Sequence, residues 1–169
     1  MIDRSILDAH LGKDIGKICG IGYDKPHDNH CAHFVSHVLG FRFGYTCAGL
    51  KRPETLHQIG GDVASIKVQE VFGKCTSVGK WEQKPVVLVQ CLVFITAPSD
   101  VNLSTRHMEN VPRKHVGIFS DGLIWHYSNS HHKVVNQTPE QFTHHYPAPH
   151  NSLFYGHIPW VPVLRRSPY

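Results

Sequence analysis

The chain has 169 residues, of which 41% are hydrophobic and 18% charged, and its formal net charge at pH 7 is +4. This length and composition predict one folded domain covering residues 1–169. The longest apolar run, residues 86–95, is too short to span a bilayer, and no nucleic-acid-binding motif is present. We therefore expect neither a membrane span nor a nucleic-acid partner.

The first half of the chain has the apolar spacing of helices. Residues 3–18 carry apolar side chains at helical spacing, which predicts an amphipathic helix. Because this segment contains no continuous apolar stretch, we expect the protein to be made in the cytoplasm without a cleaved signal peptide. Further helices are predicted over residues 30–39 and 65–72.

The second half changes to the pattern of strands. A β-branched run over residues 86–96 predicts a central strand, and the polar residues 97–114 predict a loop or insertion. Residues 115–128 predict a β-hairpin around an Asp-Gly turn. The remaining elements are a strand over residues 133–136, a capped helical turn at Thr138, and a last strand over residues 153–158. Helices first and antiparallel strands after them indicate an α+β domain.

One of five scattered cysteines lies where a reactive thiol is expected. The cysteines form no CxxC pair, which argues against a disulfide framework in a chain without a signal peptide. Cys31 falls in the first turn of the second helix, after Asp28 or Asn29 as N-cap, and Gly40 ends that helix. A helix start favours a thiolate over a thiol. The alternative is a buried structural cysteine.

The predicted hairpin brings two histidines together. If Asp121 and Gly122 form a two-residue turn, Gly117 lies opposite His126, and His115 lies opposite Ser128. His115 and His126 are then diagonal neighbours on one face, and the glycine leaves room for a ring. The opposite face is a plausible core face of Val116, Ile118, Leu123, Trp125 and Tyr127.

These residues have the pattern of a catalytic triad. Cys31 is the predicted nucleophile, His115 its base, and His126 the group that orients His115. The backbone N–H of Cys31 is expected to hold the oxyanion, with Tyr23 as a second candidate. Ser128, on the same face as the histidines, is a secondary candidate.

Fifteen histidines raise the alternative of a metal site. The densest group is His27, His30, His33 and His37, around Cys31. His33 and His37 are four residues apart and share a helical face. No second ligand pair of matching spacing is evident, so we predict no metal and no cofactor. A non-enzymatic, histidine-rich metal-binding module is kept as an alternative function.

Three segments resemble a known family in the same order. Residues 29–40, NHCAHFVSHVLG, resemble the nucleophile helix of NlpC-type and CHAP cell-wall amidases, although His30 stands where that family usually has Asp. Residues 91–95, CLVFI, are similar to its middle strand. The segments HVGIF at 115–119 and IWH at 124–126 resemble the strands of its catalytic histidine and third polar residue. The resemblance covers roughly residues 20–130.

The resemblance implies a papain-like fold, in which N-terminal helices with the nucleophile pack on an antiparallel sheet carrying the histidine. It implies hydrolysis of amide bonds in peptidoglycan stem peptides through a thioester. A phage lysin or an antibacterial effector would fit, acting in the periplasm or cell wall after lysis or non-classical export, with an immunity or inhibitor protein as partner. A protein deamidase, acyltransferase or protease is the alternative, since fold does not settle function.

Overall fold

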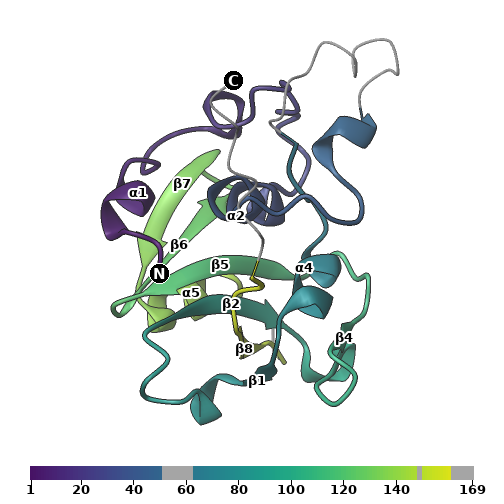
Figure 1. Cartoon of the computed structure of the whole chain (residues 1–169), viewed down its shortest axis with the longest axis vertical. Coiled ribbons are helices and arrows are strands. Elements are labelled where there is room, and N and C mark those ends of the chain that lie inside the picture. The colour runs from purple at the N-terminus through teal and green to yellow at the C-terminus, as the bar shows by residue number, and fades with distance from the viewer. Residues whose placement is uncertain (51–62, 148–149, 161–169) are drawn as a thin grey trace, which may run out of the picture.

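The computed structural model describes residues 1–50, 63–147 and 150–160, which form an α+β structure around one antiparallel sheet (Figure 1). The order of its six strands is β1-β8-β2-β5-β6-β7. They are β1 (Val78–Lys80), β2 (Gln90–Thr96), β5 (His115–Ser120), β6 (Leu123–Ser128), β7 (Lys133–Gln137) and β8 (Ser152–Gly156). A small separate hairpin of β3 (Val101–Asn102) and β4 (His107–Met108) lies in the segment predicted as a loop or insertion.

Helices cover both faces of the sheet. On one face lie α1 (Arg4–Asp8), α2 (Cys31–Leu39) and α4 (Val68–Lys74), whose apolar side chains share a core with those of β2, β5 and β6. On the other face lies α5 (Pro139–His145), through Phe142. Because both faces are covered, every residue of β5 is buried. None of the helices in the described ranges is long and apolar enough to cross a membrane.

The predicted hairpin register is confirmed. Ser120 pairs with Leu123 and Ile118 with Trp125, around a turn in which Asp121 and Gly122 both have positive φ. The end of α2 at Gly40, which has φ 72°, is confirmed as well. The cap at Thr138 is a capping box at the start of α5.

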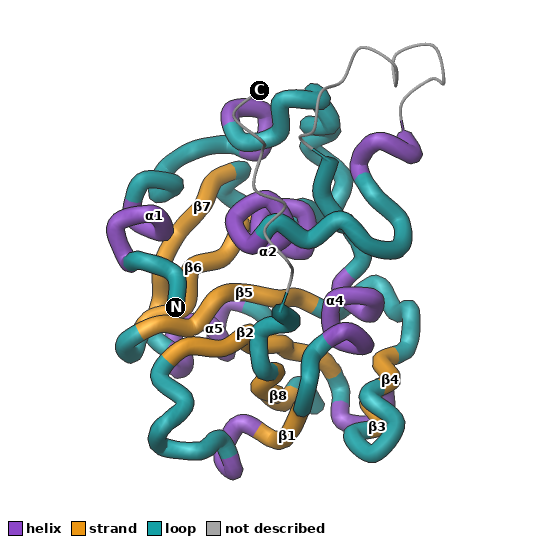
Figure 2. The backbone as a smooth tube through the Cα atoms, viewed as in Figure 1, coloured by secondary structure: helices purple, strands orange, loops and turns teal. Residues whose placement is uncertain are grey.

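The predicted helix over residues 3–18 is wrong. The helix α1 ends at Asp8, Gly12 has φ 76°, and a separate 3-10 helix covers Ile15–Lys17. The backbone between them pairs with β7 instead: Gly12 N–H donates to Val134 O, and Val134 N–H donates to Lys13 O, each at 2.9 Å. In Figure 2, α1 lies beside β7.

Three predicted boundaries move because of tertiary pairing. The strand β2 begins at Gln90, opposite Ser120, so residues 86–89 have no partner strand, and Val86 is 92% exposed. The helix α4 begins at Val68 rather than residue 65, because Ser65 forms a β-bridge with Thr46. The last strand, β8, covers Ser152–Gly156 instead of the predicted residues 153–158. The strand β1, which pairs with β8, was not predicted.

Candidate active site

The predicted nucleophile is held at the start of α2, below the surface. Cys31 is the first residue of this nine-residue helix, and its side chain is fully buried. Its thiol lies against the backbone N–H of Val116, the second residue of β5. The helix therefore brings Cys31 to the strand that carries His115.

Burial reverses the expected shift of the Cys31 pKa. Removal of the thiol from water raises its pKa to about 12, although the N–H groups of Val116 and Ala32 and the charge of Lys114 act in the opposite direction. The helix start is thus not enough to make a thiolate in the resting protein. Cys31 rests as a neutral thiol, so a base must remove its proton when it reacts.

The two predicted histidines touch on the face that also carries Phe119 and Ile124. The Nε2 atom of His115 lies 3.1 Å from Nδ1 of His126, and the rings are perpendicular, at 86°. Gly117 makes this possible, because a Cβ at that position would lie 3.1 Å from Cβ of His126 and 2.5 Å from Cγ2 of Ile124.

A glutamine that the sequence analysis missed fixes the protons on both rings. Gln137, at the end of β7, places its Oε1 atom 2.7 Å from Nε2 of His126. A carbonyl oxygen only accepts, so His126 carries its proton on Nε2, and its Nδ1 accepts a hydrogen bond from Nε2–H of His115. The Nδ1 atom of His115 is therefore the one with a free lone pair.

The lone pair on Nδ1 of His115 is buried and accepts no hydrogen bond from the described residues. Burial, and then the proximity of His126 and His145, holds the pKa of His115 well below its ordinary value. The ring is neutral at pH 7, with its basic nitrogen available to a nearby proton donor.

Tyr146 packs against the candidate base. Its ring stacks on His115 with 4.0 Å between centroids, and its hydroxyl lies 2.8 Å from Nε2 of His115. Burial raises the pKa of this hydroxyl, and the charge that Cys31 would carry acts in the same direction. No hydrogen bond joins Cys31 to His115 among the described contacts. The Cys31 side chain packs in the core on the α2 face of the sheet, whereas the His115 ring packs against Phe142 on the α5 face. Substrate binding would therefore have to bring the thiol and the ring together.

The predicted oxyanion donors are occupied. The backbone N–H of Cys31 donates to Oδ1 of Asn29 at 3.1 Å, and the Tyr23 hydroxyl donates to Asp28 at 2.6 Å. Tyr23 packs against His30 and His33 instead, which favours a packing role. The Asn29 amide in turn donates to Lys114 O at 3.3 Å.

Ser128 is buried beside the histidine pair, not beside Cys31. Its hydroxyl lies 2.8 Å from Nδ1 of His131 and 3.2 Å from Nε2 of His145. The ring of His145 packs against His126 at 5.4 Å. Ser128 therefore contacts groups that surround the orienting histidine rather than the nucleophile.

A pocket of about 430 Å³ opens onto His115. Its lining includes His115, Tyr146, Asn29, Arg113 and Lys114, so two residues with cationic side chains line the pocket beside His115. Cys31 does not line it, because the thiol is covered in this conformation.

Comparison with known proteins finds no relative: no family model, no curated protein and no solved structure matches the chain.

Proposed function

We propose that the protein is a papain-like cysteine amidase or endopeptidase that cleaves amide bonds in peptidoglycan stem peptides. One observation carries the proposal. The unused Nδ1 lone pair of His115, oriented by His126 and Gln137, lies on the strand against which the Cys31 thiol packs. A helix-start cysteine, a histidine base and a polar orienting group are what thioester chemistry requires.

The reaction begins with a neutral thiol and a neutral imidazole. As Sγ of Cys31 attacks the amide carbon, Nδ1 of His115 takes the thiol proton, and His126 stabilises the imidazolium that forms. The amide of Asn29, which lines the pocket and has a second N–H, is the side-chain donor for the oxyanion. His115 then gives the proton to the leaving amine, and a thioester remains on Cys31.

Hydrolysis restores the enzyme. His115 takes a proton from a water molecule that attacks the thioester carbonyl, and the C–S bond breaks. The proton returns to the sulfur as the carboxylic acid product leaves. The net reaction consumes one water and needs no oxidant, reductant or cofactor.

The charge of the pocket supports an anionic peptide as substrate. Arg113 and Lys114 line the approach to His115, and stem peptides carry free carboxylates that such side chains bind. Substrate in the cell wall requires action in the periplasm or wall, after lysis or export. A phage lysin or antibacterial effector, kept in check by an immunity or inhibitor protein, would act in this way.

The test is digestion of purified sacculi, with the released muropeptides identified by mass. Wild type and Cys91→Ala, which changes a buried cysteine on the face of the sheet opposite to Cys31, are expected to release the same products, and Cys31→Ala none. Cleavage by Cys31→Ala would overturn the assignment of the nucleophile. If the sacculi stay intact but the enzyme modifies an acidic protein substrate, the alternative function as a deamidase, acyltransferase or protease is favoured. That function would use the same catalytic side chains.

A further inference from the structure

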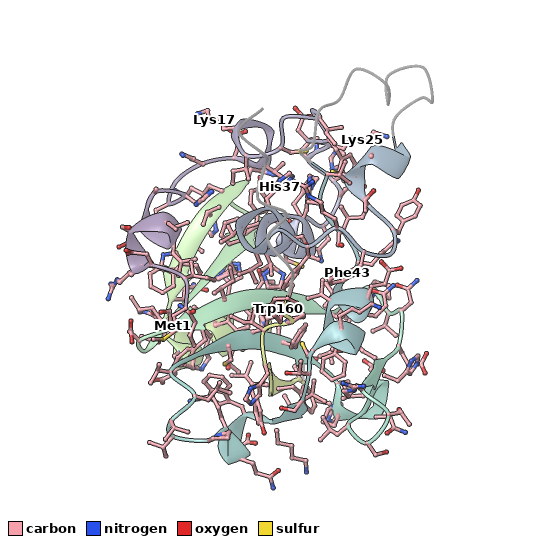
Figure 3. All side chains as sticks on the ribbon, in the orientation of Figure 1. Met1, Lys17, Lys25, His37, Phe43 and Trp160 are labelled. Carbon is pink, nitrogen blue, oxygen red and sulfur yellow. The ribbon has the colours of Figure 1, made fainter. Side chains whose placement is uncertain are left out.

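A second cluster of reactive side chains lies on the far side of α2 from the sheet. It comprises Cys19, His33, His37 and Cys47, and one ligand atom from each lies within 4.8 Å of all the others. His37 is labelled in Figure 3, beside the helix that Figure 1 labels α2 and away from β1. Cys19, His33 and Cys47 are buried, and His37 is half-buried. No step of the proposed reaction uses these groups.

The histidine nitrogens already have the spacing of metal ligands. The Nε2 atoms of His33 and His37, one helical turn apart on α2, lie 3.1 Å from each other. Two imidazole nitrogens on a tetrahedral zinc ion are about 3.3 Å apart, given Zn–N bonds of about 2.0–2.1 Å. Two thiolates on the same ion are about 3.8 Å apart. Because the four ligand atoms already lie within 4.8 Å of one another, each pair has to shorten by no more than about 1–1.5 Å to complete the tetrahedron.

A chain of hydrogen bonds fixes the tautomer that a metal needs. The carbonyl of Lys25 accepts from Nε2–H of His30 at 2.8 Å, so Nδ1 of His30 is an acceptor. It faces Nδ1 of His33 at 3.2 Å, and His33 must donate there. The lone pair of His33 therefore lies on Nε2, the atom in the cluster. Histidines that bind metals are commonly oriented by such a second hydrogen bond.

Hydrogen bonds from backbone N–H groups also favour negative charge on the two sulfurs. The backbone N–H of Tyr23 donates to Sγ of Cys19, and that of Ala64 donates to Sγ of Cys47 at 3.3 Å. Two buried thiolates are costly by themselves, but with a divalent cation the cluster is neutral. Two sulfurs and two nitrogens around a tetrahedral centre are the ligand set that suits zinc.

We propose that Cys19, His33, His37 and Cys47 bind one Zn²⁺ ion as a structural site. Binding displaces the two thiol protons and moves the remaining ring proton of His37 to Nδ1. Because four protein ligands fill the tetrahedron, no position is left for substrate. The ion joins the segment after the first 3-10 helix, the nucleophile helix and the segment at Cys47. It would fix α2, and with it Cys31, from the side that the sheet does not cover.

The test is native mass spectrometry of the full chain, purified under reducing conditions, incubated with zinc chloride and desalted. Wild type is expected to retain about one zinc per chain. Cys47→Ala and His37→Gln are expected to lose it. The matched controls, Cys91→Ala and the exposed His27→Gln, are expected to keep it. Cobalt in place of zinc is expected to give the visible absorption of a tetrahedral thiolate site in wild type and controls only.

His37→Gln is expected to leave the fold intact, because His37 is half-buried and lies in the last turn of α2. Loss of zinc from this variant would therefore not be explained by unfolding. No zinc on the reduced wild type, or equal zinc on the cluster variants and the controls, would overturn the proposal. A Cys19–Cys47 disulfide, seen as a mass two hydrogens below that of the reduced chain, would also overturn the proposal if the protein still binds no zinc after the disulfide is reduced. Each readout is independent of sacculus digestion, so the zinc site and the proposed activity can fail separately.

Discussion

The Nε2 atom of His115 and the Nδ1 atom of His126 lie 3.1 Å apart across the turn of one hairpin, and Gln137 fixes which of them donates. This relationship determines which nitrogen of His115 can act as a base. It also makes the candidate site testable without a known substrate, because the protonation of each ring can be measured directly.

The tautomers are the first prediction. Imidazole nitrogen NMR at pH 7 is expected to show both His115 and His126 as neutral rings protonated on Nε2. Gln137→Leu removes the acceptor, so the tautomer of His126 is expected to become mixed, whereas Gln137→Glu retains the acceptor and the single tautomer. Gln137 is a positioning residue, and Leu at this position is expected to lower kcat by about 10² to 10⁴ with little change in KM. Unchanged nitrogen shifts in Gln137→Leu would contradict the proposed orientation.

The second prediction concerns stability in acid. Burial lowers the pKa of His126 from 6.5 to about 4 and holds that of His115 well below 6.5, so the unfolded chain binds more protons than the folded chain between pH 6.5 and about 4. Stability is therefore full above pH 6.5 and is lost as the pH falls toward 4. His126 alone contributes on the order of 3 kcal/mol to this loss. Urea unfolding at several pH values measures it, and His126→Gln is expected to have a shallower dependence than wild type.

The third prediction concerns the thiol. A pKa of about 12 and complete burial predict slow alkylation of Cys31 at pH 7, slower than that of a free cysteine. Tyr146→Ala, which removes the stacked ring, is expected to speed alkylation of Cys31, and Tyr146→Phe is expected to leave it slow. Peptide mapping by mass spectrometry assigns the label to its cysteine. Rapid labelling of the wild-type residue at neutral pH would mean that a thiolate is already present.

The fourth prediction is steric. Gly117→Ala places a Cβ 2.5 Å from Ile124 and 3.0 Å from the carbonyl oxygen of Trp125, so the hairpin must shift. We expect a loss of about 1–3 kcal/mol in unfolding free energy and disturbed signals of His126. Gly73→Ala, within α4, is the matched control. An added Cβ at this position would meet only the backbone oxygen of Arg106, at the ordinary contact distance of 3.6 Å. That variant is expected to gain about 0.5–1 kcal/mol from helix propensity.

Local patterns predicted the parts of the site that are local in sequence. The Asp121-Gly122 turn sets the hairpin register, and the register alone brings His115 and His126 together. The position of Cys31 at a helix start followed from Gly40 and from the polar residues before the helix, although the N-cap is His30 and not Asp28 or Asn29 as predicted. These relations span few residues, and the rules of turns and caps apply to them directly.

The parts that could not be predicted depend on long-range packing. Nothing near Gln137 in the sequence indicates that its amide orients His126, and Tyr146 reaches the site only because α5 packs on the second face of the sheet. The pKa of Cys31 depends on how deeply the helix is covered, which a helix-start argument ignores. Cys19 and Cys47 have no recognisable spacing to His33 and His37, so the cluster exists only in the folded chain.

The backbone contact between Lys13 and Val134 has a consequence for how copies of this protein meet. It occupies part of the open edge of β7, while the opposite edge strand, β1, has only three residues. Open strand edges are the templates on which chains add to one another and form fibrils. In the described part of the chain, neither end of the sheet offers a long free edge. Concentrated solutions of the folded protein should therefore resist edge-to-edge aggregation. Gly12→Pro, which removes the N–H donor to β7 and cannot adopt the positive φ of Gly12, should weaken that resistance.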